Sequence, residues 1–177
     1  VPLLKSLLEK RRNDKYILVY CGATKGFEHY EGEKEKQIDI VEKMIGNELG
    51  MSTHRFTADE DGRTRRLIKE GFADGDYQVV TAIKCLDEGV NIPNIQTAYI
   101  LASSRNPKEF IQRRGRVLRT AKGKERAVIY DFVTLPRPLD EIKFGDYEVD
   151  RSMVIGELSR VYEFGRYSIN SRIADEF

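Results

Sequence analysis

The alternation of short strand-like runs with segments of helical periodicity constrains the fold of this chain most. The clearest run, Tyr16 to Cys21, is continuously apolar, as is typical of a strand buried on both faces of a parallel sheet. The four other strand-like segments cover residues 53–56, 77–82, 97–101 and 127–132. Helical patterns separate them, near 34–49, near 61–72 and after Pro107. Five strands separated by helices predict an α/β fold, a parallel sheet with helices on both faces and right-handed crossovers.

The pattern changes after Phe132. Residues 135–138 read Leu-Pro-Arg-Pro, which interrupts regular structure, and residues 140–150 are acidic and turn-like. Helical spacing returns from Met153 to Phe177. We therefore divide the 177 residues into a sheet domain at 1–135 and, at 136–177, an acidic turn region with a helical extension. The extension is expected to pack on the sheet domain or on a neighbouring domain.

Composition argues against a membrane protein. The chain is 40% hydrophobic and 33% charged, and no apolar run approaches the roughly 20 residues that a spanning helix needs. Residues 1–5 lack the pattern of a signal peptide. Cys21 and Cys85 are too far apart for a metal-binding pair, and Cys21 is expected to be a buried free thiol. These features predict a reducing compartment, the cytoplasm or the nucleoid.

A basic segment from Glu109 to Arg119 carries the first functional signal. On a helix of about 100° per residue, Gln112, Arg116 and Arg119 fall within roughly 60° of one another. The residues expected to anchor this helix to the core are Phe110, Ile111, Val117 and Leu118. Between positions 104 and 126 there are nine cationic and two acidic residues, in a chain whose net charge is only +1. This local excess predicts an anionic partner, either a nucleotide or a nucleic acid, rather than a solvated helix face.

The second functional signal is the segment from Thr81 to Pro93. It runs from a predicted strand into a polar loop that contains Gly89, Asn91 and the terminal proline. A threonine hydroxyl and backbone N–H groups at a strand end can hold a phosphate, and glycine permits close approach of the backbone to a ligand. Alone, the segment could equally be a turn.

Together the two segments resemble motifs of one known family. The order is strand, Thr, Gly-x-Asn-x-Pro, strand, helix, and then Gln-x-x-Gly-Arg-x-x-Arg. The chain is similar, from about Lys15 to Phe132, to the C-terminal RecA-like lobe of superfamily-two helicases and translocases. Residues 81–93 resemble motif V of that family, residues 112–119 motif VI, and residues 16–24 motif IV. The Gly-Val-Asn-Ile-Pro form favours the restriction-type and repair-type DNA translocases over RNA helicases.

The resemblance implies a role for each matching residue. Arg116 and Arg119 would be arginine fingers that reach the γ-phosphate of ATP, and Gln112 would organise that phosphate or the attacking water. The residues expected beside the nucleotide are Gly89, Asn91 and Arg113, although an ion pair or a solvated position is an alternative for Arg113 and Arg114. Those expected to contact nucleic-acid phosphates are Thr81 and, as weaker candidates, Thr57 and Thr24.

A phosphate-binding loop of the form Gly-x-x-x-x-Gly-Lys-Ser/Thr does not occur in the sequence, nor does an acidic Mg²⁺-binding motif at a strand end. The resemblance therefore implies that ATP and Mg²⁺ are held mainly by an N-terminal RecA-like lobe of the same polypeptide, and that this segment alone is inactive. The expected partners are that lobe and nucleic acid, DNA in preference to RNA. The alternative is a catalytically inactive RecA-like module that binds nucleic acid or a protein.

Overall fold

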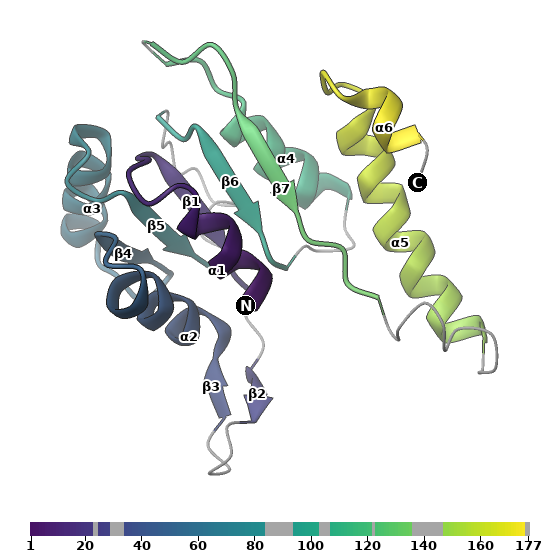
Figure 1. Cartoon of the computed structure of the whole chain (residues 1–177), viewed down its shortest axis with the longest axis horizontal. Helices are drawn as coiled ribbons and strands as arrows, with labels where there is room; N and C mark the ends of the chain where they lie inside the picture. Colours follow the sequence, from purple (N-terminus) through teal and green to yellow (C-terminus); the bar gives the residue numbers. More distant parts are fainter. Residues whose placement is uncertain are drawn as a thin grey trace.

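The computed structural model describes residues 1–22, 25–28, 34–83, 94–102, 107–121, 123–135 and 147–175. Its centre is a five-stranded sheet in the order β4-β5-β1-β6-β7 (Figure 1). The strands are β1 (Ile17–Tyr20), β4 (Thr53–Phe56), β5 (Val79–Ala82), β6 (Thr97–Ile100) and β7 (Val128–Asp131). Every neighbouring pair is parallel, so all five carboxyl ends lie at one edge. The predicted parallel α/β sheet is confirmed.

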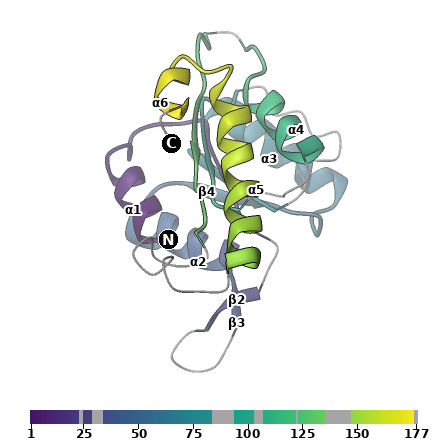
Figure 2. The ribbon, with the colours of Figure 1, turned by 90° about the vertical axis from the view of Figure 1, so that its right-hand side faces the viewer.

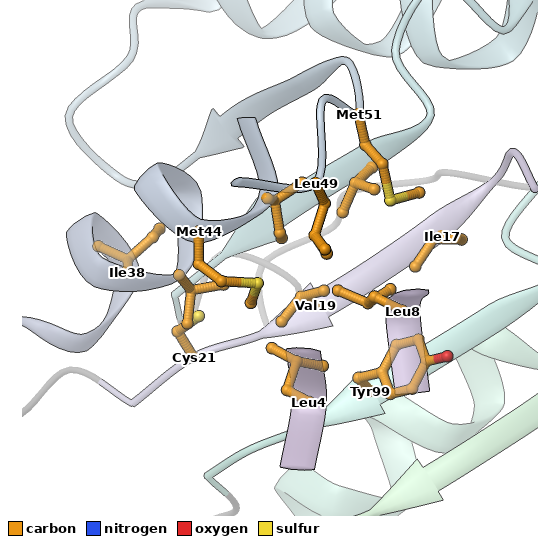
Figure 3. Packing of buried hydrophobic residues seen from close by; sticks show 13 residues of the cluster. Leu4, Leu8, Ile17, Val19, Cys21, Ile38, Met44, Leu49, Met51 and Tyr99 are labelled. Carbon is orange, nitrogen blue, oxygen red and sulfur yellow. The ribbon is translucent and has the colours of Figure 1, made fainter. Parts of the chain in front are cut away.

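Every residue of the three central strands β1, β5 and β6 is buried. This explains their continuous apolar sequences, because each strand contacts helices on both faces. One face packs on α1 (Pro2–Glu9), α2 (Gln37–Lys43) and a π-helical stretch η1 (Met44–Glu48), as Figure 3 shows. The other face packs on α3 (Gly62–Asp74) and α4 (Pro107–Val117). Helices therefore cover both faces, as expected.

The α3 helix shows why the predicted element boundaries are close to the observed ones. Asp61 caps its N-terminus by accepting a 2.7 Å hydrogen bond from the Thr64 backbone N–H. The helix ends at Gly75, whose φ of +80° is a left-handed conformation that glycine adopts without strain. Both signals are readable in the sequence, and α3 lies within two residues of the predicted range.

Two features differ from expectation. The helix predicted from Lys34 begins only at Gln37, because residues 34–36 form β3 (Lys34–Lys36), which pairs antiparallel with β2 (Lys25–Glu28). This hairpin is a separate two-stranded sheet that projects from the main sheet in Figure 1. The N-terminal helix α1 was not expected, yet Leu4 and Leu8 are fully buried.

The C-terminal extension forms a long helix, α5 (Tyr147–Gly165), and a short one, α6 (Ser171–Asp175). Figure 2 shows α5 lying beside α4 and the β7 edge of the sheet. The prediction that the extension is helical is confirmed, and it packs on the sheet domain. The helix starts six residues earlier than the predicted Met153.

Candidate functional site

The α4 helix, which carries the basic segment, buries residues spaced i, i+3 and i+7. Phe110, Arg113 and Val117 are only 5%, 4% and 1% exposed. This spacing places the three side chains on one face of a helix. The expectation that Ile111 and Leu118 also anchor the helix was wrong, since their side chains are 40% and 50% exposed. An arginine occupies the central core position instead.

Arg113 is accommodated in the core because its guanidinium stacks on an aromatic ring. Its guanidinium carbon lies 4.2 Å from the centroid of the Tyr20 ring on β1. Its Nη2 is 3.4 Å from Oε2 of Glu109, one turn earlier on the same helix. A planar guanidinium stacks on aromatic faces and is more weakly hydrated than a lysine ammonium, which lowers the cost of burying it. Arg113 therefore fastens α4 to β1, and the predicted nucleotide contact of this residue stays a prediction.

The remaining motif VI-like residues reach the surface. Gln112 and Arg119 are exposed and Arg116 is partly exposed. The helix ends at Val117, so Arg119 lies just beyond it rather than within it. Backbone hydrogen bonds continue past the end, from the Leu118 N–H to the Arg114 carbonyl (3.0 Å) and from the Arg119 N–H to the Arg116 carbonyl (3.4 Å). The chain thus continues for a tightened turn beyond the helix, in which the backbone of Arg119 is bonded to that of Arg116.

Lys124 completes the C-terminus of α4. Its Nζ donates hydrogen bonds to the backbone carbonyls of Val117 and Arg119, the latter at 2.8 Å. Burial lowers the pKa of this amine. A cation at the carbonyl end of a helix satisfies otherwise unpaired acceptors and interacts favourably with the helix dipole. Sequence reasoning missed Lys124, although a lysine soon after a predicted helix end is a recognisable capping signal.

Arg114 points to the extension rather than to the sheet. Its Nη2 lies 3.6 Å from Oε1 of Glu163 on α5, and its guanidinium packs on the rings of Phe164 and Tyr167. Of the two alternatives considered for this residue, the structure shows an ion pair. The paired arginines at 113 and 114 thus attach α4 to two different parts of the fold.

Thr81 is fully buried on β5, and its hydroxyl donates to Oε1 of Glu42 at 3.3 Å. Glu42 also forms an ion pair with Arg55 on β4, the register neighbour of Thr81. This carboxylate raises the pKa of the arginine. The arrangement connects α2 to two adjacent strands.

Thr57, just beyond β4, is 8% exposed, and both its hydroxyl and its backbone N–H donate to the Glu60 carboxylate. The hydroxyls of both threonines are therefore bonded within the lobe, and their predicted phosphate contacts stay predictions. The other predicted site residues, Thr24, Gly89 and Asn91, lie outside the described residues.

Within the described ranges, no three His, Cys, Asp or Glu side chains come together as a metal-binding group. In the same part of the chain, no helix has the length and apolar character needed to cross a membrane.

Residues 1–121 match the model of the helicase conserved C-terminal domain. The chain belongs to this family. The matched range includes α4 and the whole basic segment up to Arg119. It ends before β7 and the C-terminal extension.

Two curated proteins resemble this helicase C-terminal domain. It is 30% identical over 134 residues to the DNA 3'-5' translocase XPB2 of Sulfurisphaera tokodaii, an alignment that covers 76% of this chain and 26% of that protein. It is 26% identical over 121 residues to the Dicer-like protein 2-2 of Aspergillus niger, covering 66% of this chain and 9% of that protein. The chain therefore spans about a quarter or less of the length of these relatives.

A solved structure confirms the fold. The crystal structure of the C-terminal part of the Fun30 ATPase domain matches with a TM-score of 0.60 at 18% identity, over 93% of this chain and 53% of that one. The five-stranded parallel sheet with helices on both faces is thus the RecA-like α/β fold that the sequence motifs predicted.

Proposed function

We propose that this domain is the second motor lobe of an ATP-dependent helicase or translocase that acts on DNA in preference to RNA. The observation that carries the proposal is the difference in burial between two sets of side chains in the basic segment. The side chains of Phe110, Arg113 and Val117 are buried, whereas those of Gln112, Arg116 and Arg119 reach the surface. Membership of the helicase C-terminal family and the similarity to a protein named as a DNA translocase support this assignment.

In this function Arg116 and Arg119 act as arginine fingers. Charge builds on the oxygens of the transferred phosphoryl group in the transition state, and a guanidinium fork stabilises it through paired hydrogen bonds. Such a finger contributes about 10³–10⁵-fold to hydrolysis in other nucleotide hydrolases. Gln112 lies one turn before Arg116 on α4, close enough to orient the attacking water or the same phosphate.

The residues present suit a shared nucleotide site. Arginine and glutamine side chains can bind phosphate oxygens, so ATP would contact this lobe through Gln112 and Arg116 on α4 and Arg119 just beyond it. Gly89 and Asn91 would lie near its sugar. ATP and its Mg²⁺ would be held mainly by an N-terminal RecA-like lobe. On this proposal the 177-residue chain alone hydrolyses ATP negligibly.

The nucleic-acid contact is proposed for the carboxyl edge of the sheet, with Thr81, Thr57 and Thr24 as its candidates. In open α/β sheets, ligands bind beyond the carboxyl ends of the strands. Thr57 directly follows β4, and Thr81 is the penultimate residue of the adjacent β5. A phosphate reaching Thr81 would have to replace Glu42 as its hydrogen-bond acceptor.

The test is Arg116→Ala in the full-length protein, with Arg151→Ala, an exposed arginine on α5, as the matched control. We expect DNA-stimulated ATP hydrolysis to fall by at least about 10³-fold, because the transition-state charge loses its partner. The affinity for single- and double-stranded DNA should stay within about twofold. Unchanged hydrolysis would contradict the assignment of Arg116 as an arginine finger.

A further inference from the structure

The α5 helix contacts one side of α4, and Arg116 lies on the opposite side. Because both sides belong to one helix, α5 can influence the orientation of Arg116. At about 100° per residue, Arg114 and Arg116 flank the buried Arg113 on opposite sides of the helix. Arg113 holds the middle of α4 on the Tyr20 ring. The flank on the Arg114 side is covered by α5, and the flank on the Arg116 side reaches solvent.

The contact between α4 and the C-terminal extension has three parts. The Arg114 Nη1 donates to the backbone carbonyl of Glu163, and its Nη2 lies 3.6 Å from the carboxylate of the same residue. The Arg114 guanidinium carbon lies 5.8 Å and 5.3 Å from the ring centroids of Phe164 and Tyr167. The Phe164 ring also packs edge-to-face on Phe110, with centroids 5.8 Å apart. The side chain of Arg114 is only 15% exposed, so this contact is largely shielded from solvent.

One turn before Glu163 and Phe164, α5 is anchored to the sheet by a buried arginine on the same face of the helix. Arg160, 2% exposed, donates from Nε to Asp131 of β7 at 2.8 Å and makes a two-point ion pair with Glu157 at 2.7 and 2.8 Å. Glu157 in turn accepts the Thr134 backbone N–H at 3.0 Å. A helix fixed to β7 at one turn and to α4 at the next cannot shift without moving α4 relative to the sheet.

We propose that α5 is a brace for the motif VI helix, and that Arg114 is the positioning residue through which it sets the orientation of Arg116. This inference rests on the function proposed above and extends it to the C-terminal helix, which lies beyond the range matched by the family model. Arg114 acts only through the backbone of α4. Because a misplacement of about 1 Å can cost about 10²-fold in rate, a brace on one flank of the helix affects hydrolysis on the other.

The first test is a double-mutant cycle in the full-length protein. Arg114→Ala should lower the kcat of DNA-stimulated ATP hydrolysis by about tenfold and leave the DNA affinity within about twofold. The double variant Arg114→Ala/Arg116→Ala should be no slower than Arg116→Ala alone, because Arg114 works through Arg116. A further tenfold loss in the double variant would show an independent structural role and overturn the proposal.

The second test needs no activity. Amide hydrogen exchange across 107–117 should speed up about tenfold in the Arg114→Ala variant of the 177-residue chain. Glu163→Gln, which keeps the helix and the backbone acceptor, should give a smaller increase in the same peptide. The matched control is Arg166→Ala, which removes a guanidinium that contacts Glu163 and Tyr167 but not α4.

The two tests distinguish the failure of the proposed function from the failure of the proposed role of α5. Unchanged hydrolysis in Arg116→Ala would remove the finger assignment and, with it, the catalytic effect of the brace. Unchanged exchange of α4 in Arg114→Ala, or equal acceleration in Arg166→Ala, would overturn the brace whatever the ATPase result.

Discussion

Replacing Arg160 by methionine tests whether the extension is an integral part of the fold. The substitution keeps the apolar stem but removes the guanidinium that the Asp131 and Glu157 carboxylates share. Removing one partner of a buried ion pair costs about 3–5 kcal/mol. The carboxylates are 12% and 16% exposed, so water offsets part of the loss. We therefore expect Arg160→Met to lower the free energy of unfolding by about 3 kcal/mol at neutral pH.

The loss should depend on pH in a defined direction. Burial raises the pKa of Asp131, and Arg160 opposes that shift. Without Arg160 the pKa rises further. A group whose pKa is higher in the folded state stabilises the fold below its unfolded pKa, and this contribution is lost as the pH rises through the folded pKa. The variant should thus recover part of the lost stability between about pH 7 and about pH 4, as the carboxyl groups take up protons.

The assay is urea unfolding followed by circular dichroism at a series of pH values, with the free energy taken by linear extrapolation. Arg166→Met is the control, because that side chain is 46% exposed and should change stability by no more than about 0.5 kcal/mol. A loss in Arg160→Met no larger than in the control, or one that does not change with pH, would refute the reasoning.

Three further predictions concern other parts of the lobe. Burial raises the pKa of the Cys21 thiol to about 12, so iodoacetamide at pH about 8 should label this thiol only after urea unfolding. Peptide mass spectrometry would measure the labelling, and fast labelling of the native chain would contradict the prediction. Gly71→Ala should destabilise the lobe by about 1–3 kcal/mol in urea, since its Cβ would lie 2.7 Å from the Tyr77 ring; an unchanged midpoint would show that the ring moves aside freely. Lys124→Met should speed amide exchange in the last turn of α4 several-fold, and equal protection would rule out its capping role.

The sheet could be predicted from the sequence because its central strands are buried on both faces. In a run such as Tyr16–Cys21 no residue suits a solvent-exposed face of a sheet, so the run predicts a strand buried on both faces. The observed β1 lies within it. The β2–β3 hairpin carried no comparable signal, since Lys34–Lys36 is charged throughout and pairs mainly through its backbone. Backbone pairing depends weakly on residue type, so periodicity could not find it.

The candidate site was predictable in its spacing but not in the orientation of its side chains. A helical wheel places Arg113 on a face without showing that the Tyr20 ring, distant in sequence, will receive its guanidinium. The helical pattern therefore predicted core positions for Ile111 and Leu118, whose side chains are exposed. The ion pair of Arg114 with Glu163 depends on how the extension docks, and no local pattern encodes that.

The burial of α1 has a practical consequence for anyone who expresses this lobe. Leu4 and Leu8 lie against Val19 and Tyr99 in the cluster drawn in Figure 3, although the recognisable motifs begin only near Lys15. An expression boundary chosen from the motifs would remove this helix and expose the part of the apolar sheet face that α1 covers. Such a product would tend to self-associate, and its aggregation could be mistaken for oligomerisation. The unit that folds is larger than the unit that carries the motifs.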